Sequence, residues 1–144
     1  MAELLGTHAY QLDPKGRLTL PARFREVFAD GCWLTLGQDR CLYAFPRVEW
    51  ERRAGEVASS PLSDADGRAY QRMFFGSSEE AGLDGQGRLT VPTRLREAVG
   101  IRKEVVVVGV FDRMEIWDRE THGRYEEAHA GAYAAGSLDP SRRS

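Results

Sequence analysis

The sequence has only two cysteines, Cys32 and Cys41, among its 144 residues. Their spacing excludes CxxC chemistry, and two cysteines are too few for the disulfide framework of a small secreted domain. We therefore expect both to be reduced thiols in the core. An apolar run of 18 residues is also absent, and residues 1–12 lack the basic start and hydrophobic stretch of a signal peptide. These absences predict a soluble protein that has no contact with a membrane and stays in the cytoplasm.

Motifs for catalysis and metal binding are absent as well. Neither a GxSxG motif, a Walker loop nor a GxGxxG motif is present. The three histidines form neither an HExxH motif nor a spacing that suits zinc; they are His8, His122 and His129. Acidic pairs such as Glu126 and Glu127 are typical of solvated faces. The sequence therefore predicts no metal, no cofactor, no small-molecule substrate and no catalytic residue, and we expect the protein not to be an enzyme.

Neither sign of charge dominates the chain, whose formal net charge is −2 and whose pI is about 5.9. Hydrophobic residues make up 42% and charged residues 29%, which is typical of a folded domain rather than of a disordered chain. Because the chain as a whole is not a polycation, any site for nucleic acid must be a local basic patch.

A segment of 14 residues occurs twice. Residues 13–26 read DPKGRLTLPARFRE and residues 84–97 read DGQGRLTVPTRLRE, so that nine of the 14 positions are identical. Unrelated segments of average composition would share about one position. The similarity continues beyond this segment in two apolar stretches of each copy. The chain is therefore predicted to be a duplicated unit, in which each copy holds a hairpin, a short helix, two further strands and a longer helix.

Each copy begins with a predicted hairpin tip. Asp13 and Gly16 suit the ends of a type I turn that closes with a left-handed residue, and residues 84–87 have the same ends. Pro21 and Pro92 follow the tips; because proline favours an extended preceding residue and a helical start, a strand must become a helix there. The predicted strands are residues 9–12, 17–20, 81–83 and 88–91, and the predicted short helices are residues 22–28 and 93–99.

Four segments divide the chain: a first module at residues 1–58, a connecting amphipathic helix at 59–77, a second module at 78–133 and a disordered tail at 134–144. Ser63 and Asp66 are predicted to cap the connecting helix. The tail is predicted to be disordered because it is small and polar and contains Pro140. The predicted core residues next to the tips are Leu18, Leu20, Leu89 and Val91.

The tips carry the candidate binding residues. Glycine lets the backbone approach a phosphate closely, and a neighbouring arginine can reach a phosphate or a guanine edge. Residues 13–25 hold four basic side chains and one acidic, and residues 84–96 hold three and one. The candidate DNA-binding residues are Arg17, Lys15, Gly16 and Arg23 in the first copy and Arg88, Gln86, Gly87 and Arg94 in the second, with Arg25 and Arg96 adding positive charge. An alternative is that Arg17 and Arg88 only form ion pairs, with Asp13 and Asp84, that shape the turns.

Two DxxxR tips, each followed by a strand and a proline-initiated helix, resemble the MraZ family of bacterial regulators. The resemblance extends from Met1 to about Tyr133 and includes the phrase KEVVVVG at residues 103–109. It implies an α+β, β-rich fold of two tandem AbrB-like swapped-hairpin modules that form an intramolecular pseudo-dimer. One departure is Gln86 in place of a second lysine, so the second tip is expected to be the weaker phosphate binder.

The same resemblance implies a function. It implies a sequence-specific transcriptional regulator, usually a repressor, that binds double-stranded DNA at direct repeats upstream of the division and cell-wall gene cluster. It also implies that the protein is a homo-oligomer, a closed ring, associated with the nucleoid. A ring suits direct repeats because neighbouring subunits share one sense along the DNA. The alternative function is an AbrB-like interaction module or antitoxin-type assembly module whose main ligand is a protein.

Overall fold

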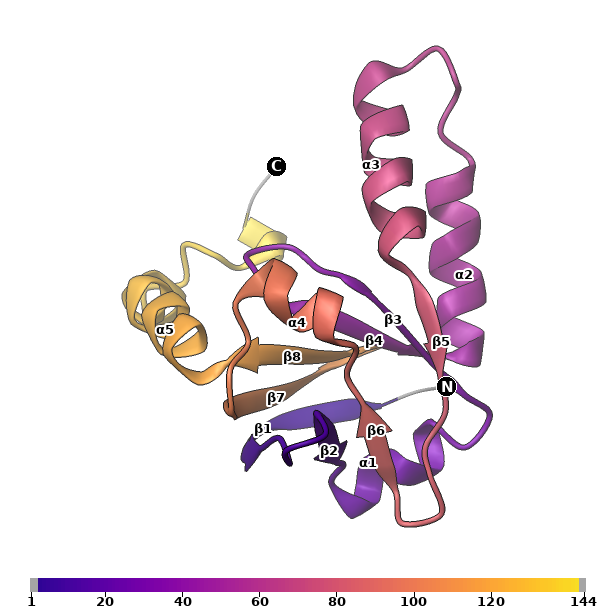
Figure 1. Ribbon diagram of the computed structural model, residues 1–144. Helices are drawn as coiled ribbons and strands as arrows, with labels where there is room; N and C mark the ends of the chain where they lie inside the picture. The colour runs from indigo at the N-terminus through magenta and orange to yellow at the C-terminus, as the bar shows by residue number, and fades with distance from the viewer. Residues whose placement is uncertain (1–2, 143–144) are drawn as a thin grey trace.

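The computed structural model describes residues 3–142, which form one six-stranded antiparallel sheet, one two-stranded ribbon and the helices around them (Figure 1). The strand order in the sheet is β1-β7-β8-β4-β3-β5, and the ribbon pairs β2 with β6. The strands are β1 (Leu4–Gln11), β2 (Arg17–Thr19), β3 (Cys32–Leu36), β4 (Leu42–Pro46), β5 (Glu79–Ala81), β6 (Arg88–Thr90), β7 (Glu104–Phe111) and β8 (Met114–Asp118). The helices are α1 (Ala22–Val27), α2 (Arg47–Ala58), α3 (Ala65–Ser77), α4 (Thr93–Val99), α5 (Arg119–Ala134) and the 3-10 helix η1 (Pro140–Arg142).

The strands that enter the two tips are exchanged between the copies. β1 of the first copy pairs with β7 of the second along its whole length, from Leu4 opposite Phe111 to Gln11 opposite Glu104. In the same way β5 of the second copy pairs with β3 of the first. The ribbon pairs one strand from each copy, with Leu18 opposite Leu89. The α+β fold of two swapped modules, predicted through the family resemblance, is confirmed, and the strand order is symmetric about the β8–β4 pair.

The prolines end the ribbon strands where the sequence predicted. Pro21 and Pro92 are the N-terminal caps of α1 and α4, and both have the extended ψ of 141° that turns the chain into a helix. α4 closes with Gly100 in the left-handed conformation, at φ 71°. The predicted core residues of the ribbon are almost fully buried; they are Leu18, Leu20, Leu89 and Val91.

The core lies on both faces of the sheet. Side chains alternate along a strand, so Val105 and Val107 of β7 face the larger core while Val106 faces a second cluster with Trp117 and Cys41. The larger core also holds the ribbon leucines and the apolar residues of α1 and α4. Cys32 and Cys41 are both buried and free, as predicted. The ribbon is thus held on a packed platform, which limits its freedom to move.

The two copies are joined by a pair of helices that projects from one end of the molecule (Figure 1). Trp50 of α2 stacks on Phe74 of α3 with ring centroids 5.4 Å apart, and Arg53 donates to the Tyr70 hydroxyl at 2.9 Å. The helix predicted within residues 59–77 corresponds to α3. No helix within residues 3–142 is long and apolar enough to cross a membrane.

The cap of α3 differs from the predicted pair of Ser63 and Asp66. Asp64 is the N-cap, and its Oδ1 accepts a hydrogen bond from the backbone N–H of Asp66 at 3.2 Å. The reason is that the helix begins at Ala65, so the residue directly before it is the one whose carboxylate meets the free N–H groups of the first turn. Ser63 lies one residue too early.

The C-terminal stretch has a defined course up to Arg142 where the sequence predicted a disordered tail. Ser137 donates from its hydroxyl to the carbonyl of Ala132 at 3.0 Å, and the Asp139 carboxylate accepts from both the backbone N–H and the hydroxyl of Ser141. Local side-chain bonds of this kind order a polar segment. The last part of the predicted tail, residues 143 and 144, lies outside the described residues.

Candidate nucleic-acid interface

An aspartate holds the first tip in shape. Asp13 Oδ1 accepts hydrogen bonds from the backbone N–H groups of Lys15, at 2.9 Å, and Arg17, at 2.8 Å. Its other oxygen, Oδ2, accepts from Arg17 Nε at 2.6 Å. The turn closes through the N–H of Gly16, which donates to the Asp13 carbonyl at 2.9 Å, and Gly16 has a φ of 76°. This is the predicted turn with a left-handed closing residue.

The second tip repeats the same geometry. Asp84 Oδ1 accepts from the N–H groups of Gln86 and Arg88, both at 2.9 Å, and Oδ2 accepts from Arg88 Nε at 2.8 Å. Gly87 has a φ of 74° and donates its N–H to the Asp84 carbonyl at 3.0 Å. Since the two tips agree in every bond, the residues that the copies share determine the shape, and the differing residues at positions 14 and 85 do not disturb it.

The aspartates are stabilised in their ionised form. The backbone N–H of Arg17 lowers the pKa of Asp13 most, and the Arg17 side chain and the Lys15 N–H act in the same direction against partial desolvation. The pKa of Asp84 is lowered by the corresponding groups of Arg88 and Gln86. A carboxylate that accepts several N–H bonds is favoured over the neutral acid. Both tips therefore keep their shape at neutral pH.

The ribbon turns one apolar and one polar face in opposite directions. Leu18 and Leu89 point into the core, and the alternation of a strand places Arg17 and Thr19 of β2 and Arg88 of β6 on the outer face. Thr90 completes this outer face. The Arg17 and Arg88 side chains are 28% and 26% exposed. Within residues 3–142 each guanidinium is bonded only through Nε, which leaves its two terminal nitrogens for another partner.

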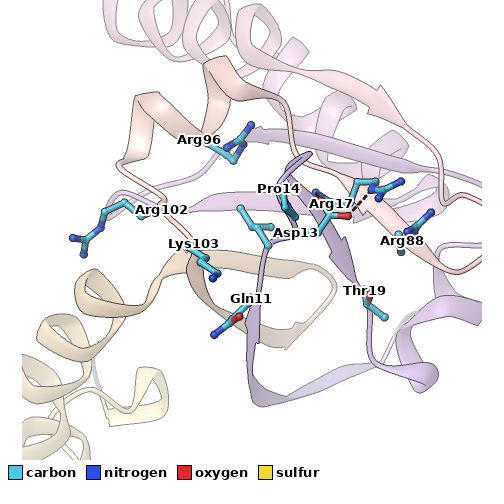
Figure 2. Close-up of a pocket in the computed structure, with 10 residues that line it drawn as sticks. Gln11, Asp13, Pro14, Arg17, Thr19, Arg88, Arg96, Arg102 and Lys103 are labelled. Carbon is cyan, nitrogen blue, oxygen red and sulfur yellow. Dashed lines mark hydrogen bonds and ion pairs between the residues drawn. The ribbon is translucent and has the colours of Figure 1, made fainter.

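A cationic groove of about 730 Å³ lies beside the first tip. Figure 2 shows Arg102 and Lys103 on one side of Asp13 and Arg17 and Arg88 on the other. The residues that line the groove are Gln11, Leu12, Asp13, Pro14, Arg17, Thr19, Arg88, Arg96, Arg102 and Lys103. Five of these carry positive charge and one carries negative charge, so the groove attracts anions although the whole chain has a net charge of −2.

Two arginines cross from one copy to the tip of the other. Arg25 of α1 donates from Nε to the Leu20 carbonyl at 3.2 Å and lies against Gly87 of the second tip. Arg96 of α4 donates from Nε to the Val91 carbonyl at 3.0 Å and lies against Gly16 of the first tip. The repeat predicts only added positive charge for these arginines, because nothing in it indicates that each helix meets the opposite tip.

The other predicted residues are distributed unevenly. Lys15 and Gln86 lie at the exposed ends of their tips. Arg94 instead forms an ion pair with Glu79 at 2.8 Å, and Arg23 is exposed on α1; neither lines the groove. Arg94 is thus engaged by an acidic side chain of β5.

The groove also contains Arg102 and Lys103, which sequence analysis did not select. Both stand in the connection between α4 and β7, far from either tip in the sequence. Exchange of the entering strands brings this connection beside the first tip, where the Leu12 N–H donates to the Lys103 carbonyl at 2.8 Å. Two adjacent basic residues are a sequence signal for a basic patch. The first copy has no basic residues at the equivalent positions, so the repeat does not point to Arg102 and Lys103. Within residues 3–142 no three potential metal ligands lie together.

Comparison with known proteins finds the same family along nearly all of the chain. The family model described as "MraZ protein, putative antitoxin-like" matches twice, at residues 4–73 and 74–135. A protein of Saccharopolyspora erythraea named "Transcriptional regulator MraZ" is 49% identical over 130 residues, which cover 90% of this chain and 91% of that protein. Proteins with the same name from Heliobacterium modesticaldum and Salinispora arenicola are 42% identical over 129 residues and 47% identical over 115 residues. These two matches cover 90% and 80% of this chain, and 90% and 81% of the relatives.

Proposed function

The chain belongs to the MraZ family, and on this premise we propose that it is a transcriptional regulator that binds double-stranded DNA through its paired tips. The observation that carries the proposal is the outer face of the ribbon, where Arg17 and Arg88 lie diagonally across the two strands with their terminal guanidinium nitrogens unbonded within residues 3–142. The relatives named as transcriptional regulators support the same function.

A two-stranded ribbon with arginines on its outer face suits sequence readout. The major groove of DNA admits a two-stranded β-ribbon, and arginine can donate two hydrogen bonds to the O6 and N7 atoms of guanine. Asp13 and Asp84 hold the Nε atoms of Arg17 and Arg88, so little side-chain entropy remains to be lost when the terminal nitrogens meet a base. The alternative role of these ion pairs, to shape the turns, is thus compatible with readout. Lys15 and Gln86 at the ends of the tips would meet the phosphates.

One pair of tips offers few contacts, so we expect affinity to depend on repetition. Linked contacts raise apparent affinity by roughly 10² to 10⁴. The proposal therefore includes a closed ring of identical chains on short direct repeats, upstream of the division and cell-wall gene cluster, with repression as the effect. These features are those implied by the MraZ resemblance. A protein with this function is cytoplasmic and nucleoid-associated, and it needs neither a cofactor nor a catalytic site.

The test is a gel shift with DNA from upstream of the protein's own gene. Arg17→Ala removes the guanidinium but no core contact, so we expect loss of the shifted band with unchanged circular dichroism and unchanged mass in solution. Arg72→Ala removes an exposed arginine of α3 and serves as the control, with binding like that of the parent. Parental binding by the Arg17 variant would contradict the proposal.

A second function, protein recognition, is favoured by a different surface. The α2–α3 pair and the loop between its two helices expose apolar side chains, with Leu62 79%, Val48 72% and Met73 61% exposed. Exposed apolar side chains can contact a protein partner, and the matched family model is described as antitoxin-like. A protein partner that copurifies at fixed stoichiometry, together with no DNA shift at low salt, would favour this function over DNA binding.

A further inference from the structure

The two flanks of the pseudo-symmetric unit differ in charge. The first tip lies beside the connection between α4 and β7, residues 100–103, which contains Arg102 and Lys103. The matching connection between α1 and β3, residues 28–31, contains Asp30 and no basic residue. A fold that is symmetric in its strands is therefore asymmetric in its electrostatics.

The strands that enter the tips strengthen this difference. β5, which leads to the second tip, begins with Glu79 and Glu80, whereas β1 has His8 and Ala9 at the equivalent places in the repeat. Glu79 neutralises Arg94 through their ion pair at 2.8 Å. Glu80 is exposed next to Gly31, and Arg47 of α2 lies over Trp33 on the same side, so the flank of the second tip carries charges of both signs, whereas the connection beside the first tip carries two cations.

Among the cations of the groove, Lys103 has the fewest polar contacts from its side chain within residues 3–142. Its carbonyl is held by the Leu12 N–H at 2.8 Å, which fixes the backbone beside the first tip. Its side chain is exposed and forms no ion pair within residues 3–142. Arg102, by contrast, is shared by Asp118 and Glu120 at 3.1 and 2.9 Å. Arg96 completes the cationic wall of the groove.

We propose that the groove beside the first tip binds the DNA backbone, with Lys103 and Arg96 facing phosphates, so that each chain contacts its duplex unequally on its two sides. The proposal rests on the proposed function and deepens it. Contacts to phosphates fix the register and orientation of a protein on DNA but do not read its sequence. The unequal flanks therefore give each chain a direction along the duplex, because the groove beside the first tip attracts phosphates and the second flank, with charges of both signs, attracts them less.

The test compares the salt dependence of binding for Lys103→Gln and for Arg72→Gln, an exposed arginine on α3 that serves as the charge-matched control. The logarithm of the binding constant falls with the logarithm of the salt concentration by about 0.9 for each phosphate neutralised. Lys103→Gln should therefore reduce this slope by about 0.9 and weaken binding by up to about tenfold at 0.1 M salt. The control should change neither, and both variants should keep the parental mass in solution and the parental circular dichroism.

Two further measurements locate the contact. Phosphate ethylation should interfere with binding on one side of the recognised bases, and this interference should weaken in the Lys103→Gln variant, in which Arg96 still faces the backbone. Glu80→Gln, on the second flank, should strengthen binding, since it removes an exposed negative charge from that flank. Interference that is equal on both sides would overturn the unequal contact.

The outcomes separate the two proposals. If Lys103→Gln keeps the parental slope while Arg17→Ala abolishes the gel shift, the groove does not bind the backbone and the proposed function stands. If Arg17→Ala binds like the parent, the tips do not read DNA and both proposals fail. A slope that changes equally for the Lys103 and Arg72 variants would show a general charge effect and would overturn the groove.

Discussion

Arg96 lies against Gly16, although the two residues belong to different copies of the repeat: a Cβ atom added to Gly16 would lie 2.8 Å from Arg96 Nη2. Arg25 has the same relationship to Gly87, where an added Cβ would lie 2.7 Å from Arg25 Nε. Each tip therefore needs its glycine for two reasons, the positive φ and the close approach of an arginine from the opposite copy. The conformation of one tip depends on a helix that follows the other.

The first prediction concerns the glycines of the second tip. Gly87→Ala places a side chain at a φ of 74° and against Arg25, so we expect a loss of about 1–3 kcal/mol in the free energy of unfolding. Gly85→Ala, in the same turn, adds a methyl group with no atom within 4 Å and should change this free energy by less than about 0.5 kcal/mol. Urea denaturation of both variants checks the difference, and equal losses would count against the geometry of the tip.

The second prediction concerns the unequal ends of the tips. Gln86 occupies the place that Lys15 has in the first tip. Gln86→Lys should add one phosphate contact, which would raise the salt slope of DNA binding by about 0.9 and the affinity by up to about tenfold at 0.1 M salt. Gln38→Lys introduces the same charge at an exposed position outside the tips and should leave the slope unchanged. A gain that is shared by both variants would mean that the tip has no special part in it.

The third prediction follows from the lowered pKa values of Asp13 and Asp84, which backbone N–H groups of Arg17 and Arg88 lower most. A carboxylate whose pKa is lower in the folded protein stabilises the fold above its unfolded pKa, here 3.8, and this contribution is lost as the pH falls through the folded value. The double variant Asp13→Asn, Asp84→Asn should therefore lose stability at neutral pH and depend less on pH below 3.8 than the parent does. Unfolding free energies measured across acidic pH test this, and parallel curves for parent and variant would refute it.

The fourth prediction concerns the thiols. Burial raises the pKa of Cys32, and burial followed by the nearby Glu115 carboxylate raises the pKa of Cys41. Since the thiolate is the reactive form, neither thiol should react with a disulfide reagent in the folded protein at mildly alkaline pH. Both should react in denaturant. Rapid labelling of the folded chain would show that one of these sites opens, and DNA binding should not respond to reducing agents.

Much of the local structure could be predicted because it depends on neighbours in the sequence. Asp13 and Gly16 define the first turn, and Pro21 marks the change from strand to helix, as the structure has them. The burial of Leu18 and Leu89 follows from their alternation with the polar residues of a short strand. The predicted N-cap of α3 was wrong by one residue, which is the usual error at a helix end.

The arrangement across the copies could not be derived from periodicity or turn composition. Nothing in β1 alone indicates that it pairs with β7 rather than with β2, and the exchange was expected only through the family resemblance. The approach of Arg96 to Gly16 depends on that exchange, as does the position of Lys103 beside the first tip. Arg94 forms an ion pair with Glu79. Glu79 precedes it by 15 residues, so the sequence alone does not indicate that the two side chains meet.

The exchanged strands also decide how the chain would respond to a break. The segment at residues 59–64, between α2 and α3, is largely exposed, so a protease could cut it while the rest of the fold stays intact. Each fragment would still have its first strand paired within the other and would share the ribbon with it. The nicked protein would then persist as a noncovalent heterodimer, whereas either half expressed by itself would lack partners for its first strand and for its ribbon strand.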